Sequence, residues 1–367
     1  MKRRGEYMFE LTNEQRRCFA LVMVDPEWER IKIKAAPYDT FETYAYCENN
    51  IIRKCIITSD IEYCEYELCE AISDDGKYLL PKTSKGKPVP LSSSNLLKRT
   101  SLGMCLNYNH GYIALYNNST QCAYYSTSYE DDKIKTINEF EEWVNNWCAE
   151  TSEKDFIDIN KFANQSRRHV KFQEGDVFRF KIDRRLFGYG RIILDFDKMR
   201  KRKETFWDIL MSKPLVCSVY HIATERNDVT IEELSNLKSL PSTIIADNHL
   251  YYGEYEIIGN LPITENEDYP IMYGRSIAHG EDAICFQFGK IFKKIENGQL
   301  LFGGFRNNGV SFTLNVQKKV LFECIQDNTN IPYWNNYFKH STNNDLRSPK
   351  FHEEREKIGE QMGVYLN

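Results

Sequence analysis

The sequence predicts an α+β protein of two domains, each a mostly antiparallel sheet with peripheral helices. The chain has 367 residues, more than the roughly 250–300 over which one hydrophobic core grows. Its apolar residues come in short runs separated by polar turn clusters, the pattern of antiparallel strands. Three capping-box tetrapeptides mark helices outside these runs. The prediction covers open sheets and barrel-like sheets.

The two parts of the chain differ in charge. Residues 1–165 carry 20 Lys and Arg against 26 Asp and Glu, a balance of −6, whereas residues 166–367 carry 28 against 27, a balance of +1. The polar segment 164–168 between them has the composition of a linker. We therefore expect a boundary near 155–170, with an N-terminal α+β domain over 1–160 and a β-rich domain with a C-terminal helix over 168–367.

Local signals place the elements of the first domain. The tetrapeptide Thr12-Asn13-Glu14-Gln15 has capping-box spacing and predicts that a helix starts there. Apolar runs then predict strands around residues 31–33, 51–57, 63–68 and 112–116. A second capping box begins at Thr136, and helical spacing of apolar residues follows it at Ile137, Phe140, Val144 and Trp147.

The second domain opens with a predicted antiparallel hairpin. Over 178–182 the apolar residues Phe178, Phe180 and Ile182 alternate with Arg179 and Lys181. After a short loop, a second strand is expected in which one face carries Gly190, Ile192, Leu194 and Phe196, and the other Tyr189, Arg191, Ile193 and Asp195. The segment 215–222 is apolar on both faces, which predicts a central strand. The remaining elements are a short helix from the capping box at Thr230, strands near 250–258, 283–289 and 318–325, and a terminal helix starting at Ser348-Pro349.

Composition excludes several classes of protein. No apolar run approaches the roughly 18 residues needed to cross a bilayer, and the basic start is not followed by an apolar signal region. We expect a cytoplasmic protein with no membrane partner. The 11 Cys are scattered without a CxxC pair, which favours reduced thiols over a disulfide framework or a zinc ribbon.

Patterns for catalysis are incomplete. The loop 81–87 is rich in Lys but lacks the glycine and hydroxyl positions of a phosphate-binding loop. The sequence has no GxSxG nucleophile elbow. His221, His249 and His279 are the best candidates for metal or acid–base chemistry, but no HxH, HxxxH or HExxH brings two of them onto one face. The sequence therefore predicts no metal site and no cofactor.

Two charged segments offer binding surfaces. The basic run 198–203, followed by Phe206 and Trp207, has the composition of a nucleic-acid contact, but a solvated loop is the favoured interpretation. On the predicted strand 62–70, Glu65 and Glu67 share one face and are expected to be exposed. Together with Asp131 and Asp132 they form a hypothetical acidic surface that attracts a basic partner, the alternative being acidic residues that serve solubility alone.

Three segments of the second domain resemble the bacterial immunity protein 26 family. These are Lys171–Phe180 with its Gly-Asp before a hydrophobic strand, Phe187–Ile193 with its Tyr-Gly-Arg, and Tyr252–Gly259, in that order. The resemblance covers about 170–260, or up to 330 if the following residues belong to the same domain. The N-terminal half resembles no family.

The resemblance implies a cytoplasmic protein of bacterial polymorphic toxin systems that binds and neutralises a cognate toxin without catalysis. The predicted toxin contacts are Glu65, Glu67, Asp131 and Asp132. The positions that match the family segments, Gly175, Asp176, Gly190 and Arg191, are expected to be structural: the glycines serve strand ends, and the acid and the base pair across the hairpin. The self-association of the chain is left open.

The resemblance also leaves a second function open, that of a hydrolase. Some relatives carry a phosphotriesterase-type label, which implies a hydrolase. Such an enzyme requires a metal pocket that joins His221, His249 or His279 with a carboxylate such as Asp247 or Glu254.

Overall fold

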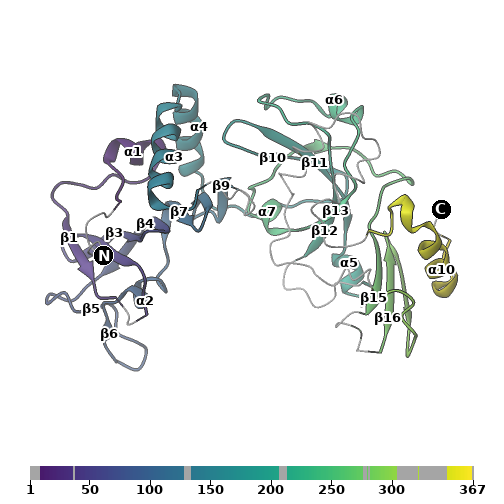
Figure 1. The fold of residues 1–367 in the computed structure, drawn as a ribbon, viewed down its shortest axis with the longest axis horizontal. Coiled ribbons are helices and arrows are strands. Elements are labelled where there is room, and N and C mark those ends of the chain that lie inside the picture. The colour runs from purple at the N-terminus through teal and green to yellow at the C-terminus, as the bar shows by residue number, and fades with distance from the viewer. Residues whose placement is uncertain are drawn as a thin grey trace. The chain divides into compact units, whose positions relative to one another are not determined.

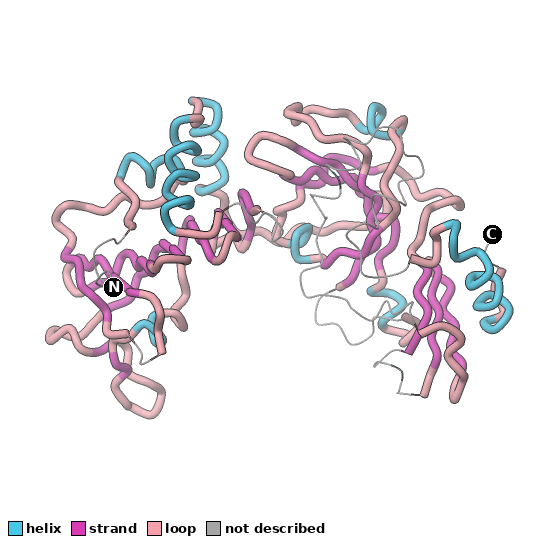
Figure 2. Tube along the Cα trace, in the orientation of Figure 1, coloured by secondary structure: helices cyan, strands magenta, loops and turns pink. Residues whose placement is uncertain are grey.

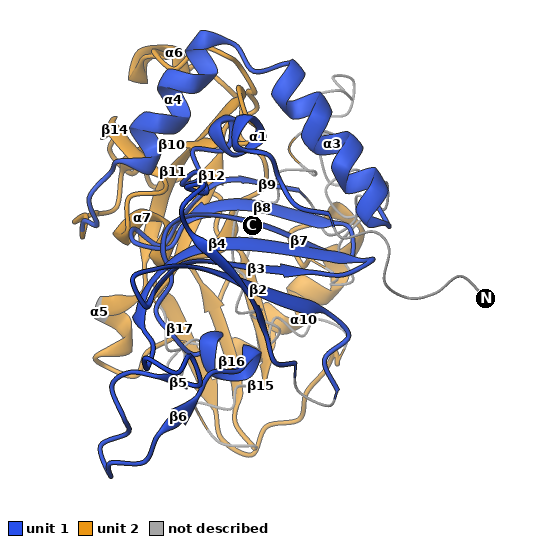
Figure 3. Cartoon of the chain, turned by 90° about the vertical axis from the view of Figure 1, so that its left-hand side faces the viewer, with its two compact units in different colours: residues 1–168 blue, residues 169–367 orange. Residues whose placement is uncertain are grey.

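The computed structural model in Figure 1 describes residues 9–35, 38–127, 134–205, 213–275, 279, 282–303, 321 and 345–365. The chain divides into two compact units, residues 1–168 and 169–367 (Figure 3). Antiparallel sheets with few helices make up both units, as Figure 2 shows. The predicted α+β class is therefore confirmed. The strands described here form open sheets, so the barrel-like form of the prediction is not seen among them.

The first unit is built on one seven-stranded antiparallel sheet with the strand order β1-β2-β3-β4-β7-β8-β9. Strands that follow each other in the chain are neighbours in the sheet, except where the small β5–β6 hairpin is inserted between β4 and β7. The strands are β1 Glu29–Ile33, β2 Glu42–Glu48, β3 Ile51–Thr58, β4 Glu62–Ala71, β5 Tyr78–Leu79, β6 Val89–Pro90, β7 Leu102–Asn109, β8 Tyr112–Asn117 and β9 Cys122–Ser126.

Helices in the described residues of this unit are α1 Asn13–Cys18, α2 Ser93–Leu96, α3 Ile137–Ala149 and α4 Glu153–Ala163. The capping boxes predicted at Thr12 and Thr136 are confirmed, because each side chain accepts the N3 backbone N–H and the N3 side chain returns the bond. Ser152 forms a third box at the start of α4. These caps satisfy backbone donors that the first helical turn leaves unpaired.

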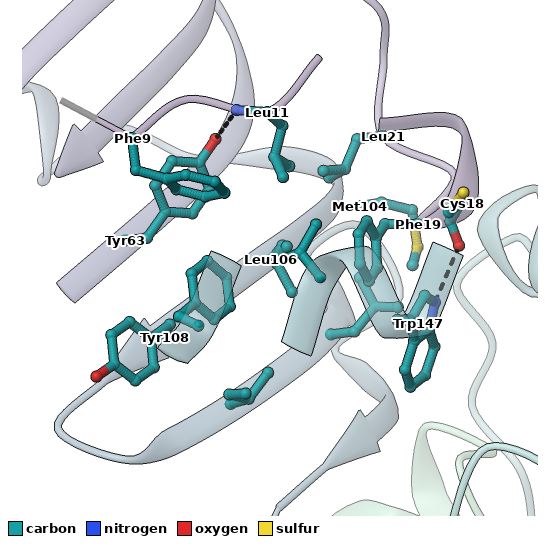
Figure 4. Close-up of a cluster of buried hydrophobic side chains, with 14 of the residues drawn as sticks. Phe9, Leu11, Cys18, Phe19, Leu21, Tyr63, Met104, Leu106, Tyr108 and Trp147 are labelled. Atoms are coloured by element: carbon teal, nitrogen blue, oxygen red, sulfur yellow. Dashed lines mark hydrogen bonds between the residues drawn. The ribbon is translucent and has the colours of Figure 1, made fainter. Parts of the chain in front are cut away.

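Aromatic side chains fill the core between the sheet and helices α1, α3 and α4. The ring of Phe140 on α3 stacks on Tyr108 of β7, with ring centroids 4.7 Å apart. In Figure 4, the indole N–H of Trp147 donates to the Cys18 carbonyl at 3.3 Å, which ties α3 to the end of α1. A second core on the other sheet face includes Cys55, Leu79 and Leu96.

The second unit contains a five-stranded sheet with the order β13-β12-β11-β10-β14 and a three-stranded sheet β15-β16-β17, both antiparallel. Their strands are β10 Asp176–Lys181, β11 Phe187–Asp195, β12 Pro214–Val219, β13 Thr243–Ala246, β14 Glu256–Asn260, β15 Ile271–Arg275, β16 Ile284–Phe288 and β17 Ile291–Ile295. The predicted hairpin of β10 and β11 is confirmed, and β12 is an interior strand as its apolar composition predicts.

Short helices complete this unit: α5 Asp197–Arg200, α6 Ile231–Ser235, α7 Asn248–Tyr251 and α10 His352–Met362. The capping box at Thr230 is confirmed. The strand predicted near 250–258 is wrong in its first half, because α7 ends at Tyr251, turns follow it, and β14 starts only at Glu256. The terminal helix begins with a 3₁₀ turn over Pro349–Phe351. The strand predicted near 318–325 lies, apart from Leu321, outside the described residues.

No helix in the described part of the chain combines the length and the apolar composition needed to cross a membrane.

Candidate functional site

Glu65 does not lie on an exposed surface, so that expectation from the sequence is wrong. Glu65 is 0% exposed to solvent. The alternation of side chains along β4 is as expected and places Glu65 on the same face as Tyr63, but this face is the one that helices α1 and α3 cover. Tyr63, for instance, packs against Phe140 of α3 at a ring distance of 5.6 Å.

The buried Glu65 carboxylate is held by three donors. Arg16 Nε on α1 donates to Oε1 at 2.8 Å. Lys54 Nζ on β3 donates to the same oxygen, and the Tyr63 hydroxyl donates to Oε2 at 2.5 Å. One carboxylate thus faces two buried cations, an arrangement that compensates the desolvation of all three charges.

A second carboxylate extends this network toward the first strands. Glu10 accepts from Arg16 Nη2 at 2.9 Å and from the Tyr46 hydroxyl at 2.5 Å, and its other oxygen lies 3.4 Å from Arg30 Nη2. We refer to Glu10, Arg16, Lys54, Tyr63 and Glu65 as the buried charge cluster. Because its members come from the N-terminal segment, α1, β3 and β4, the cluster ties the chain start to the middle of the sheet.

Burial and charge act in opposite directions on these groups. Burial alone raises the pKa of the Glu65 carboxyl, but the positive charges of Lys54 and Arg16, with their hydrogen bonds, hold it below its ordinary value. For Lys54, burial is the larger effect, and its pKa is lowered although Glu65 partly opposes the change. The pKa of Tyr46 is raised to about 12 by burial and by its bond to Glu10.

The other acidic residues of the hypothetical surface do not assemble with Glu65. Glu67 is half-buried, and burial raises the pKa of its carboxyl. Asp131 and Asp132 lie outside the described residues. Among the residues that the structure describes, Glu65 and Glu67 therefore form no exposed acidic face.

The sequence around Lys54 contains a signal that could have indicated the buried charge cluster, and the prediction of an acidic surface did not use it. Lys54 stands in the run Ile51-Ile52-Arg53-Lys54-Cys55-Ile56-Ile57, and a lysine between apolar residues on both sides of a strand requires a buried anion. The carboxylate that satisfies it, Glu65, lies on the adjacent strand.

In the second unit, the β10–β11 hairpin shows why its glycines are needed. In the strand register Phe178 stands opposite Gly190, and Phe180 stands opposite Gly188. A Cβ at Gly190 would lie 2.5 Å from Phe178 Cζ and 2.9 Å from the Ser218 carbonyl oxygen, and one at Gly188 would meet the Phe180 ring. The two phenylalanine rings occupy the space that side chains would take at the glycines.

Gly175 and Asp176 form the entrance to this hairpin. Gly175 has a φ of +92°, a conformation that glycine adopts without strain. Asp176 accepts the Gln173 backbone N–H at 2.8 Å and the Asn260 side-chain N–H at 2.9 Å, so it fixes the turn before β10 against the end of β14.

Arg191 does not pair with Asp176, and that expectation is wrong. In the register Arg191 is opposite Val177, so Asp176, one residue earlier, faces the other side of the sheet. Arg191 instead forms an ion pair with Glu267, and its Nη1 donates to the Pro262 carbonyl at 3.2 Å. Arg191 thereby ties the segment after β14 to the sheet.

This hairpin and the sheet around it match the model of one family. Residues 173–283 match the family model for immunity protein 26. The resemblance found in the sequence is confirmed, and the match ends at residue 283. The comparisons with curated proteins and with solved structures gave no match. We call residues 173–283 the immunity segment; it contains the whole five-stranded sheet and β15.

The histidines of the immunity segment have separate surroundings. His249 Nδ1 lies 3.0 Å from Glu254 Oε1, and its ring stacks on Tyr255. His279 Nε2 lies 2.7 Å from the Thr205 carbonyl oxygen. In the described ranges, no three side chains of His, Cys, Asp or Glu lie where they could share a metal ion. His249 and Glu254 are one of the His–carboxylate pairs that the alternative hydrolase requires, but no third such side chain joins them among the described residues.

The basic run of the immunity segment is partly neutralised. Its first residues form α5, where a loop was expected, and Lys201 Nζ lies 3.2 Å from Asp197. Arg202 Nε lies 2.9 Å from Glu204. Phe206 and Trp207, the expected base-stacking residues, lie outside the described residues. Local acidic partners reduce the charge available to a phosphate backbone.

The ten described cysteines form no disulfide with one another. The sulfurs of Cys64 and Cys105 lie 3.8 Å apart on neighbouring strands of the first unit. Burial raises the pKa of the nearby Cys55 to about 12. Such thiols stay protonated and are poor nucleophiles at neutral pH.

Proposed function

We propose that this chain is an immunity protein that binds and neutralises a cognate bacterial toxin without catalysing a reaction. The observation that carries the proposal is the match of residues 173–283 to the immunity protein 26 model. The matched residues include both halves of the Phe178–Gly190 and Phe180–Gly188 packing and the Arg191–Glu267 pair, so the match covers a complete folded sheet.

The proposed mode of action is occlusion of the toxin by a complementary protein surface. Such an interface typically covers about 800 Å² per partner and depends on a few buried anchors surrounded by charge. The proposed location is the cytoplasm, where a pair of thiols such as Cys64 and Cys105 stays reduced.

Glu65 is no longer one of the acidic residues proposed to contact the toxin. Glu65 cannot steer a partner, because its charge is buried and compensated by Arg16 and Lys54. Glu67, Asp131 and Asp132 remain as predicted acidic contacts. Their joint substitution by Gln and Asn should slow association with a basic face of the toxin and weaken its salt dependence. Unchanged association kinetics would remove them from the interface.

The first experiment is a survival assay. The C-terminal domain of the large protein encoded next to the gene, the expected toxin, is expressed in bacterial cells with the 367-residue chain, and with an empty vector as control. Growth that is restored only by this chain supports the proposal. Continued killing with the chain present, at confirmed expression, contradicts it.

A titration then separates binding from catalysis. Purified toxin is assayed with increasing amounts of the chain. A stoichiometric inhibitor abolishes toxin activity at a fixed molar ratio, and the inhibition does not grow with incubation time. An enzyme that inactivates the toxin acts at far lower ratios and progressively with time. The proposal predicts the first result.

A further inference from the structure

The loop that joins β5 to β6 is a basic projection of the first unit. It extends from the seven-stranded sheet as a hairpin (Figures 1 and 3), and residues 80–88 are all exposed. We call residues 78–90 the lysine hairpin, because Lys82, Lys85 and Lys87 lie within its tip. The sequence lacks phosphate-loop spacing here, so nucleotide binding does not explain it.

The lysine hairpin is held in one conformation from its base to its tip. At the base, Leu79 is fully buried and Val89 packs against the same core. At the tip, Thr83 closes the loop: its N–H donates to the Lys87 carbonyl at 2.9 Å, and its hydroxyl accepts the Lys87 N–H at 3.0 Å. These contacts restrain the loop, which lowers the conformational entropy that binding a partner would cost.

The charge of the lysine hairpin is not compensated locally. Within the part of the chain that the structure describes, Lys82, Lys85 and Lys87 form no ion pair, whereas Lys77 outside the tip pairs with Asp75 at 3.4 Å. Three like charges within six residues repel one another, and an opposite charge on a partner relieves this repulsion.

Two apolar side chains accompany these charges. Since Leu79 points into the core, its neighbours Tyr78 and Leu80 point outward, and each is 36% exposed. An aromatic and an aliphatic anchor beside a charged rim is the composition of a protein–protein contact.

We propose that the lysine hairpin docks on an acidic face of a protein partner, with Tyr78 and Leu80 as its apolar anchors. The inference rests on the proposed function, in which that partner is the toxin. A protein fits better than a nucleic acid or an anionic membrane, because residues 1–165 carry a balance of −6 that repels an extended polyanion. A compact acidic patch meets only the local positive charge.

The test compares two full-length variants with the same change in net charge. In the first, Lys82→Gln, Lys85→Gln and Lys87→Gln remove the hairpin charge. In the control, Lys135→Gln, Lys154→Gln and Lys161→Gln remove three exposed charges beside or within α3 and α4. Association and dissociation rates with the toxin domain encoded next to the gene are measured by surface plasmon resonance over a range of salt concentrations.

We expect the hairpin variant to associate about tenfold more slowly at low salt and to lose most of its salt dependence, while the control stays close to the wild type. A third variant, Tyr78→Ala, should dissociate about tenfold faster. Wild-type kinetics in the hairpin variant overturn the proposal while the proposed function stands. If the wild type does not bind the toxin, both are overturned.

Polyanions serve as a second probe of the same variants. The wild type is mixed with a duplex oligonucleotide and with vesicles of phosphatidylglycerol and phosphatidylcholine. Absence of binding to both supports a protein partner. Binding to either that disappears in the hairpin variant assigns the lysines to a polyanion and overturns the proposal.

Discussion

Arg16 Nε donates to Glu65 Oε1 across 2.8 Å in the core of the first unit, although 49 residues separate the two in the chain. The same guanidinium reaches Glu10 through Nη2, so Arg16 bridges two carboxylates. Lys54 adds a second buried cation on Glu65. Glu65, which was predicted to lie on an acidic binding surface, is therefore part of the core.

Substitution of Glu65 should destabilise the protein more than substitution of its partner Lys54. Glu65→Gln leaves Arg16 and Lys54 buried beside a neutral amide, which should destabilise the first unit by about 3–5 kcal/mol. Lys54→Met removes a buried charge while Glu65 keeps Arg16 and Tyr63, so its cost should be much smaller or its effect stabilising.

Urea unfolding followed by tryptophan fluorescence measures these changes, because Trp143 and Trp147 pack in the core of the first unit. Glu142→Gln, at an exposed position of α3, is the control and should shift the free energy of unfolding by less than about 0.5 kcal/mol. A larger loss in Lys54→Met than in Glu65→Gln would contradict the assignment of Glu65 as the compensating charge.

The lowered pKa of Lys54 predicts that the free energy of unfolding changes with pH in the alkaline range. Between that lowered pKa and the ordinary value of 10.5, the unfolded chain binds more protons at Lys54 than the folded chain does. The free energy of unfolding therefore rises with pH through this window. Relative to Lys54→Met, which lacks the group, the wild type should gain stability as the pH rises through this window toward 10.5. Parallel unfolding curves for the two proteins over this range would show that Lys54 does not titrate in this way.

Local signals in the sequence predicted the elements well. The boxes at Thr12, Thr136 and Thr230 each consist of four neighbouring residues, and all three start helices. The strands of the β10–β11 hairpin follow from alternation and a short loop. These features depend on interactions within a few residues, which is why a single sequence contains them.

The candidate site could not be predicted in the same way, because its contacts join distant segments. Alternation placed Glu65 on one face of β4, but whether that face is exposed depends on α1 and α3. Likewise the partner of Arg191 is Glu267, 76 residues further along the chain. A hairpin pattern supplies no information about such a partner, and the nearer acid, Asp176, is the wrong one.

The packing of Phe178 over Gly190 predicts an unequal response of the two glycines of β11. Gly190→Ala meets both the Phe178 ring and the backbone oxygen of Ser218, whereas Gly188→Ala meets only ring atoms of Phe180, which can move. We expect Gly190→Ala to cost about 1–3 kcal/mol and Gly188→Ala to cost less. Gly303→Ala is the control in the same unit, because no atom of the described residues lies within 4 Å of a Cβ at that position.

Hydrogen exchange of the β10 and β11 amides reports this loss directly, since exchange accelerates as the sheet opens more often. Combining Gly190→Ala with Phe178→Leu should restore part of the protection, because the smaller side chain makes room for the methyl group. If Gly190→Ala exchanges like the control, close packing is not the reason for glycine at this position.

Arg347 should hold the C-terminal helix on the second unit. Its guanidinium donates to the Ser242 hydroxyl at 2.9 Å and to Asp268 and Asp345 at 2.7 Å, and it is almost fully buried. Helix α10 follows five residues later and packs its Ile358 and Met362 into the core around β15 and β16.

Arg347→Met removes the hydrogen bonds of the guanidinium to Ser242, Asp268 and Asp345. We therefore expect the α10 amides to exchange at least about tenfold faster, while the β10 and β11 amides change little. Lys357→Met, at an exposed position of α10, tests whether any change in this helix has the same effect. Equal acceleration in both variants would mean that α10 is marginally stable by itself, and that Arg347 is not its anchor.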